Sequence, residues 1–570
     1  MANSESPSHL SIHCGREDTE KNLIRQEQPS SSRGGWSAAI FIIFVEMAER
    51  FAYYGTAGNL ITYLTNELHE PIPMAAKNVN TWVGVSSLLP IIGAFVADAF
   101  LGRFNTILGS SIIYCFALIM LTLTVSIMPR HYRKAMFFVS LYLLAIGQGG
   151  HKPCVQTFAA DQFDEDSPEE KKAKSSFFNW WYMGIVVGAS TATLAVIYVQ
   201  DNVGWAAGFG ILTGAMVVAL VLFLLGFKRY RKQGPLGSPF TKVVQVLVAA
   251  ARKRCVDGTL MTGFGVYKDD ESQHDTRTLA HTSQYRCLDK AMIIDQLDAS
   301  SMTRNPWRLC SQNQIEQVKL VLRLIPIWLC CLMFAVVQSF SVTFFTKQGS
   351  TMVRSIGSNF KLPQASLQVF IGLTIIVVVP IYDRVFVPAA RKITGHSSGI
   401  TTLRRIGIGL FVSIFTMVVS ALVEAKRVRI ARDQNLLDNP KTIVPMRVWW
   451  LIPQYMICGL SDVFTFVGLQ EFFYDQMPEE MRSMGAAAYL SAIGVGNFLS
   501  NAIISVVQEI SSMHGEKWLG NNINRAHLDS FYWVIAALGT LNLCVYVFVA
   551  KLFVYKKFEA QEANKEKELT

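Results

Sequence analysis

Two glutamates and one arginine interrupt the first long apolar stretch of the chain. Glu46, Glu49 and Arg50 lie near the middle of the apolar run 36–64. A charged residue at the centre of a bilayer costs about 2.5 to 3.5 kcal/mol, so we expect all three to face the protein interior. Helical spacing puts them on one face with Tyr53, at positions i, i+3, i+4 and i+7. Because Arg50 neutralises one carboxylate, the other favours its protonated form. The cluster predicts proton binding rather than an ion pair that only fixes helix packing.

Two further charged residues fall inside apolar stretches, one in each half of the chain. Lys152 follows three closely spaced glycines and precedes Pro153, a pattern that predicts a loosened helix lining a cavity. Its neighbour His151 can titrate, although a packed histidine is the more common case. Glu471 lies short of the end of its apolar stretch. It is either a partner for Lys152 across the two halves or a charge at a helix end.

The elements that must hold these residues are membrane helices. The chain has 570 residues, of which 51% are hydrophobic and 16% charged, with a mean hydropathy of +0.30. A membrane helix needs roughly 20 mainly apolar residues, and about twelve such stretches recur along the sequence. We therefore expect an all-α membrane protein with twelve transmembrane helices in two six-helix bundles.

A polar stretch in the middle of the chain separates the two predicted bundles. It contains a helix that starts at Pro239 and is apolar on one side, which either lies on the membrane surface or is a solvated connector. Lys and Arg counts in the loops favour both termini in the cytosol. The predicted segments are a polar cytosolic N-terminal tail at 1–35, a first bundle at 36–227, a cytosolic central segment at 228–316, a second bundle at 317–555 and a cytosolic C-terminal tail at 556–570.

Composition and motifs argue against several other classes. The net charge of +10 is spread over loops between spans, so we expect no nucleic-acid partner. The ten cysteines form no CxxC pair and no zinc-type spacing, which predicts neither disulfides nor a metal site. The sequence has no phosphate loop, nucleophile elbow or cleaved leader. We expect no enzyme, and no cofactor other than a coupling proton.

An acid and a base recur at a corresponding turn in each half. Asp98 with Arg103 closes the second span, and Asp383 with Arg384 closes the eighth. The recurrence suggests that the two halves are structural repeats. We expect these residues to lock neighbouring helices in one state of a moving bundle, and ordinary loop charges are the alternative.

The run EMAERFAYYG at 46–55 resembles the E-x-x-E-R-F-x-Y-Y-G signature of proton-dependent oligopeptide transporters. Further stretches that contain Arg103, Lys152 and Glu471 resemble the plant nitrate and peptide transporter family, within the major facilitator superfamily. The resemblance covers essentially the whole chain. It implies the fold of that superfamily, with cytosolic termini, and a proton-coupled carrier.

The resemblance also assigns roles by position. Glu46, Glu49 and Arg50 take the place of the proton-coupling motif. Lys152 takes the place of the lysine in span four, and Glu471 that of the acid in span ten that pairs with it or contacts substrate. The substrate contacts that the resemblance implies are Arg50, Tyr53, Tyr54, Lys152 and Glu471.

The chain departs from well-known members of that family where substrate is chosen. Tyr182, next to Trp181, replaces the small polar residue of the peptide carriers. Gln338 stands where a dual-affinity nitrate carrier has a histidine, and it offers hydrogen bonds but no positive charge. We expect all three to contact substrate. Thr106 matches a phosphorylated position of that nitrate carrier and implies a regulatory kinase. A hydroxyl that bonds helix backbone is the alternative.

The sequence therefore predicts secondary active symport of protons with a small anionic or carboxylate-bearing solute, of the nitrate or di- and tripeptide class. Two other functions stay open. One is an uncoupled facilitator or exporter of nitrate or a plant metabolite on an internal membrane, and the other is a transporter-like sensor. The intact charged motif favours coupling. The expected partners are the solute, protons and the lipid bilayer of the plasma membrane or the vacuolar membrane.

Overall fold

Long apolar helices dominate the computed structural model of the chain. Ten of its helical segments are long and apolar enough to cross a membrane. Among the described residues, two other helices exceed 20 residues, namely α2 (Trp36–Ala57) and α6 (Arg130–Ala160). These two carry the charges singled out in the first half of the sequence. The ten segments and these two helices make up the twelve that the sequence predicts.

The structure describes most of both predicted bundles and part of the central segment. The described residues are 34–163, 168–232, 234, 239–254, 279–294, 298, 305–357, 360–394, 400–439, 442–477, 482–513 and 518–556. The predicted tails lie almost wholly outside this set.

The N-terminal half places six long helical segments between short turns. In addition to α2 and α6 it contains α3 (Leu60–Asn66), α4 (Ile72–Val96), η1 (Ala97–Leu101), α5 (Arg103–Ser126), α7 (Pro168–Thr191), η2 (Ala192–Val196), α8 (Ile197–Asn202), α9 (Trp205–Leu225) and η3 (Gly226–Lys228). Here η1 and η2 are π-helical turns that continue the preceding helix, and η3 is a 3₁₀ turn.

The C-terminal half repeats this plan. It contains α12 (Gln312–Val342), α13 (Phe344–Ser350), β1 (Met352–Val353), β2 (Ser355–Ile356), β3 (Phe360–Lys361), η6 (Gln364–Gln368), α14 (Val369–Ile381), η7 (Tyr382–Phe386), α15 (Val387–Thr394), α16 (Thr402–Asp433), β4 (Val444–Arg447), η8 (Val448–Leu451), α17 (Ile452–Gln476), α18 (Arg482–Met513) and α19 (Leu528–Leu552). Strand β1 pairs with β4 in parallel, and β2 with β3 antiparallel.

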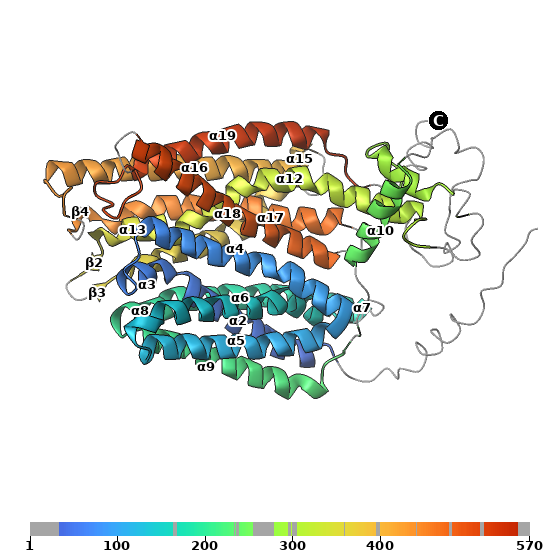
Figure 1. Ribbon diagram of the computed structural model, residues 1–570, viewed down its shortest axis with the longest axis horizontal. Coiled ribbons are helices and arrows are strands. Elements are labelled where there is room, and N and C mark those ends of the chain that lie inside the picture. Colours follow the sequence, from blue (N-terminus) through green and yellow to red (C-terminus); the bar gives the residue numbers. More distant parts are fainter. Residues whose placement is uncertain are drawn as a thin grey trace, which may run out of the picture.

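The two halves lie side by side (Figure 1), with α4 of the first packed on α18 of the second. Glycines permit this contact, because a Cβ at Gly494 would lie 2.9 Å from the carbonyl oxygen of Gly84. Several hydrogen bonds join the halves at the end away from α10. Examples are Gln364 Nε2 to Thr62 Oγ1 and Gln368 Nε2 to the Gly58 carbonyl oxygen, both at 2.9 Å. These bonds close this conformation at that end.

The predicted helix in the central segment is α10 (Pro239–Arg252), and it lies at the other end of the bundle (Figure 1). Part of its apolar side is covered by protein: Val246 and Ala249 pack with Met292 of the 3₁₀ turn η5 (Arg286–Met292) and with Val318 of α12. Val244 and Leu247 of the same helix are 45% and 41% exposed, so α12 and η5 cover only part of its apolar surface, and both interpretations of the helix stay predictions.

Candidate functional site

The charged cluster of α2 lies inside the N-terminal half. Its residues are three and four positions apart, so one face of the helix carries all of them. Glu46 and Glu49 are buried, with exposures of 2% and 0%. Arg50 Nε donates to Glu46 Oε1 at 2.7 Å and lies 3.4 Å from Glu49 Oε2. Helical spacing predicted this shared, interior face.

The cluster has more acceptor atoms than its donors reach. Among the described residues, neither Glu46 Oε2 nor either carboxylate oxygen of Glu49 has a hydrogen-bond partner. A buried acceptor without a partner costs about 1 to 3 kcal/mol, and more when it is charged. A proton on Glu49 removes one of the two negative charges that face a single arginine. The cluster therefore holds one more buried carboxylate than Arg50 can satisfy.

Only part of the cluster is within reach of a solute. The side chain of Arg50 is 21% exposed and Tyr54 is 38% exposed, whereas both carboxylates are enclosed. Helix α7 covers α2 closely, because a Cβ at Gly188 would lie 2.4 Å from the Met47 carbonyl oxygen. A solute in this site therefore meets the guanidinium and the phenol, and not the carboxylates.

Lys152 reaches the same site from α6, where it is 9% exposed. Its Nζ lies 3.9 Å from the ring centre of Tyr53, as a cation–π contact, and that ring stacks on Trp82 at 5.9 Å. The helix is continuous through its glycines and Pro153, so the predicted loosening around Lys152 is wrong. The glycines serve close packing instead: a Cβ at Gly93 of α4 would lie 2.0 Å from the carbonyl oxygen of Gly149.

The predicted bond between Lys152 and Glu471 is not the arrangement in this structure. Glu471 Oε2 accepts from Arg405 Nη1 at 3.0 Å, and its side chain is 39% exposed. The residue lies close to the end of α17. Glu471 is therefore a charge near a helix end, which was the alternative reading, and its assignment as a substrate contact loses its support.

Asp462 lies deeper in the same helix, and we did not single it out from the sequence. It is nine residues before Glu471, about 13 Å along a helix axis. Among the described residues its Oδ1 is buried without a hydrogen-bond partner. Tyr54 of the first half lies within electrostatic range of both Arg50 and Asp462. The signal in the sequence was an aspartate in the middle of a helix of 25 residues.

Gln338 lies on α12 in the wall that the C-terminal half contributes. Its Oε1 accepts from Cys458 Sγ at 3.1 Å, and Cys458 is one turn before Asp462 on α17. A further aromatic residue, Tyr489 of α18, lies within electrostatic range of Arg50. Gln338 thus contacts α17 one turn from Asp462, and its role as a substrate contact stays a prediction.

Trp181 and Tyr182 on α7 are predicted to contact substrate, and the position of Trp181 does not support this role. Trp181 is 5% exposed and packs in an apolar cluster with Phe177, at 5.7 Å between ring centres. Helical spacing puts both rings on the side of α7 that faces α2, so Trp181 supports the packing of these helices. We withdraw it as a substrate contact. The side chain of Tyr182 lies outside the described residues, and its role stays a prediction.

The predicted gating residues lie in two similar turns. Asp98 is in η1 and Asp383 in η7, both π-helical, which agrees with a structural repeat. Arg103 Nε is 3.7 Å from Asp98, and the same guanidinium bonds Asp161 after the end of α6. It thus joins the turn before α5 to α6, as expected of a helix lock. Arg384 is exposed, and the side chain of Asp383 is outside the described residues.

Thr106 lies in the first turn of α5 and is 6% exposed. Its Oγ1 donates to the Gly102 carbonyl oxygen at 2.9 Å. A kinase needs an accessible hydroxyl. This geometry therefore favours the alternative, in which the hydroxyl bonds helix backbone.

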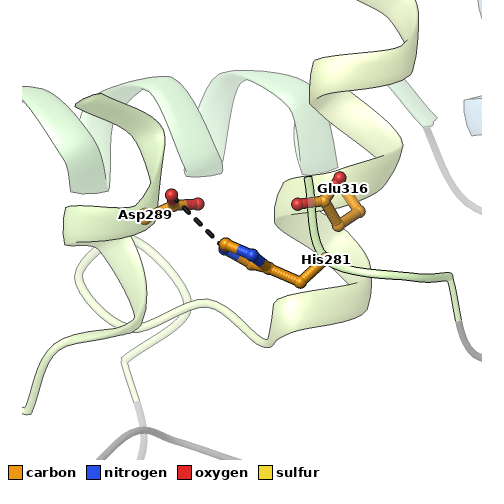
Figure 2. A group of neighbouring side chains, drawn as sticks. All are labelled: His281, Asp289 and Glu316. Carbon is orange, nitrogen blue, oxygen red and sulfur yellow. Dashed lines mark ion pairs between the residues drawn. The ribbon is translucent and has the colours of Figure 1, made fainter. Parts of the chain in front are cut away.

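A histidine and two carboxylates join the central segment to α12 (Figure 2). Ligand atoms of His281, Asp289 and Glu316 lie within 4.8 Å of one another, and His281 Nε2 is 3.4 Å from Asp289 Oδ2. Lys319 Nζ lies 2.6 Å from Asp289 Oδ1 and 2.8 Å from Glu316 Oε1. Arg323 Nη2 lies 3.8 Å from Glu316 Oε2, so two bases already face the two carboxylates, and the group suits fastening the segment better than holding a metal ion.

Comparisons with known proteins agree with this architecture. The family model described as "PTR2: POT family" matches residues 104–519. Protein NRT1/ PTR FAMILY 5.4 of Arabidopsis thaliana is 55% identical over 545 residues, which cover 94% of this chain and 98% of that protein. These matches confirm the resemblance that the charged motif carried.

Solved structures show the same fold. The crystal structure of an auto inhibited POT family peptide transporter has a TM-score of 0.69 at 22% identity and covers 90% of this chain and 96% of its own. A POT family transporter in complex with 5-aminolevulinic acid has a TM-score of 0.62 at 14% identity and covers 90% and 96%. The predicted fold is confirmed as that of the major facilitator superfamily, with twelve helices in an integral, multi-pass membrane protein.

The matched family covers most of the chain, and the related plant protein is similar over nearly its full length. On this evidence the chain belongs to the POT family of membrane transporters, in its plant NRT1/PTR branch.

Proposed function

We propose that the protein is a proton-coupled symporter of a small anionic or carboxylate-bearing solute. The observation that carries this proposal is the sharing of Arg50 between two buried carboxylates, Glu46 at 2.7 Å and Glu49 at 3.4 Å. Of these three groups, only the guanidinium is partly exposed. Proton binding and solute binding therefore compete for one cation.

The coupling follows from charge. When both carboxylates are ionised, Arg50 is held by its own helix. A proton on Glu49 leaves the guanidinium with Glu46 alone, and its remaining N–H groups become available to an anion. Arginine presents donors in a fork that matches a carboxylate or nitrate in two parallel bonds. A bound proton thus raises the affinity for the solute, and by linkage the bound solute raises the affinity for the proton.

Alternation between two open states needs charges that change partners across the halves. Lys152 of the first half contacts an aromatic ring here, and Asp462 of the second half has a buried oxygen without a partner among the described residues. We propose that these two groups pair when the halves rock toward each other at the α10 end. Asp462 takes the role that the sequence suggested for Glu471.

The solute class rests on the cations that line the site and on relatives. Arg50 and Lys152 both attract a negative group. The related transporter solved with 5-aminolevulinic acid binds a carboxylate, and the matched plant relative carries the nitrate and peptide family name. Nitrate and di- or tripeptides are therefore the first solutes to examine.

Uptake into liposomes that contain the purified protein tests the proposal. Nitrate and a dipeptide are offered with an inward proton gradient and then without it, at a fixed membrane potential. We expect acid-stimulated uptake that Glu49→Gln and Arg50→Ala each abolish. With one proton per solute, uptake is electrogenic for the zwitterionic dipeptide and electroneutral for nitrate. The matched control is Glu471→Gln, which removes another glutamate paired with an arginine, Arg405, and should keep the response to the gradient. Full pH-dependent uptake by Glu49→Gln contradicts the proposal.

A further inference from the structure

His151 is buried in the N-terminal half without a hydrogen bond. It is 0% exposed, and neither Nδ1 nor Nε2 has a partner among the described residues. A neutral imidazole carries one donor and one acceptor, so both functions are unused. Each unsatisfied buried polar group costs about 1 to 3 kcal/mol. A histidine that only fills space is poorly suited to this position.

The backbone of α6 closes tightly around this residue. A Cβ at Gly147 would lie 2.9 Å from the backbone N of Tyr114 on α5, and one at Gly149 would lie 2.7 Å from the Cβ of Leu89 on α4. At Gly150 a Cβ would lie 2.9 Å from the Cβ of Ser110. The space between α4, α5 and α6 is therefore sealed from lipid, and polar groups inside it must bond one another or water.

Several other buried polar atoms in these helices also lack partners. Among the described residues they are both carboxylate oxygens of Glu49 on α2, Ser86 Oγ on α4, Ser111 Oγ on α5 and Gln148 Oε1 on α6. Gln148 Nε2 donates to the Tyr114 hydroxyl at 3.1 Å, and the Tyr114 and His151 ring centres are 6.4 Å apart. Buried water typically makes about three hydrogen bonds to such groups. Gln148, three positions before His151 on α6, and the Tyr114 hydroxyl bonded to it are therefore polar groups near the imidazole that a bridging water can bond.

Charged groups around the imidazole leave one favourable way to place a proton on it. Glu49 and Arg50 on α2 and Lys152 on α6 lie within electrostatic range of His151. The titratable group from α5 is Tyr114, and α4 contributes the neutral hydroxyl of Ser86. Two cations oppose an imidazolium and one carboxylate favours it. An imidazolium is therefore favoured only while Glu49 is ionised.

We propose that His151 is a second proton-binding group of the transport cycle, joined to Glu49 through buried water. The inference rests on the proposed symport. Protonated Glu49 gives its proton to a bridging water, and that water gives a proton to a ring nitrogen of neutral His151. The O–H bond of the carboxylic acid is replaced by an N–H bond, and the net charge of the two groups stays zero. The reverse transfer returns the proton from His151 to Glu49.

One proton is thus shared by two groups on different helices. With the proton on Glu49, Arg50 is available to the solute. With the proton on His151, the ionised Glu49 attracts Arg50 again. His151 therefore holds the proton inside the protein while Arg50 releases its solute.

The test combines uptake with infrared spectroscopy of the full chain in liposomes. With ¹³C-labelled histidine, solute addition at constant pH should weaken an imidazolium band that is absent in His151→Gln, because the solute-bound state has its proton on Glu49. The ratio of proton-driven uptake to solute exchange should fall by roughly tenfold or more in that variant. Ser140→Ala on the same helix is the control, because its hydroxyl bonds the Met136 carbonyl oxygen at 2.8 Å within α6. It should keep both the band and the ratio.

Two outcomes overturn the inference while the symport stands. One is an unchanged ratio and band in His151→Gln, and the other is a wild-type spectrum without any response to solute. If His151→Gln does not fold, the same measurements are made on Tyr114→Phe. This variant keeps the imidazole and removes one hydroxyl that the bridging water would bond. Tyr114→Phe should lower the ratio in the same way, and a wild-type ratio contradicts the water link. If the proposed symport itself is wrong, a different measurement shows it, because Glu49→Gln then keeps the pH response of the wild type.

Discussion

Two buried glutamate–arginine networks lie in the two halves of the protein, and they differ in how fully they are satisfied. In the C-terminal half, Arg427 of α16 donates to both carboxylate oxygens of Glu424, at 2.8 and 2.6 Å. The same guanidinium bonds Thr351 Oγ1 at 3.1 Å, Asn524 Oδ1 at 2.6 Å and the Ile523 carbonyl oxygen at 2.9 Å. Both charged residues are 0% exposed.

The network on α2 has the same residue types in a different ratio. Two carboxylates share Arg50 there, and Glu49 receives no hydrogen bond from the described residues. One acid per base with every donor used fixes the turns around residues 351 and 523 to α16. On α2 two carboxylates share one guanidinium, so one buried negative charge is left over that a proton could neutralise. The comparison teaches that the count of partners, and not burial alone, separates a structural ion pair from a proton site.

The largest expected effect comes from breaking the satisfied network. Arg427→Ala leaves Glu424 as a buried, uncompensated charge, which costs about 3 to 5 kcal/mol. We expect a marked loss of folded protein and a lower melting temperature in detergent. The double variant Glu424→Gln/Arg427→Gln should recover much of this loss, because no charge is left unpaired. A wild-type melting curve for Arg427→Ala would show that the network is not structural.

The opposite result is expected on α2, where neutralising one acid relieves a buried charge. Glu49→Gln should keep or raise stability, by about 1 kcal/mol, since an amide is less costly to bury unpaired than a carboxylate. The melting temperature and the pH response of uptake are measured on the same preparation. If Glu49→Gln loses as much stability as Arg427→Ala, Glu49 belongs to a structural ion pair and not to a proton site.

A smaller effect separates the two acids of α17. Asp462→Asn removes the buried carboxyl group within electrostatic range of Tyr54, and we expect proton-driven uptake to fall about tenfold, equivalent to about 1.4 kcal/mol. Glu471→Gln removes a half-exposed partner of Arg405 and should change uptake by less than about twofold, as exposed ion pairs contribute about 1 kcal/mol or less. If the two variants lose equal amounts of proton-driven uptake, Glu471 contributes to transport as much as Asp462 does.

Periodicity and hydropathy predicted what depends on local sequence. The twelve helices, the helix at Pro239 and the interior face of Glu46 and Arg50 all follow from side-chain spacing within one element. These predictions are confirmed because the bilayer permits few structures other than apolar helices, and buried charges must turn inward.

Depth and partners could not be predicted in the same way. Glu471 was paired with Lys152 because each lies in an apolar stretch, but no sequence spacing shows that Glu471 is at the end of α17 beside Arg405. The glycines near Lys152 predict a helix break, whereas the structure uses them for close contact with α4. Trp181 was assigned to the pocket from a substitution, although its helical face points to α2. Each error concerns a contact between helices.

The smallest expected effect concerns Thr106, whose hydroxyl bonds the Gly102 carbonyl oxygen. Thr106→Ala removes one local hydrogen bond, worth about 1 kcal/mol or less, and should leave the concentration dependence of uptake as in the wild type. Thr106→Asp places a carboxylate in the same tight position, beside α6 at Gly150, and should lower the melting temperature. The measurement is uptake against solute concentration, scaled to the amount of folded protein. A regulatory phosphate predicts different apparent affinities for the two variants after that scaling, whereas a backbone bond predicts equal affinities, because neither change reaches Arg50.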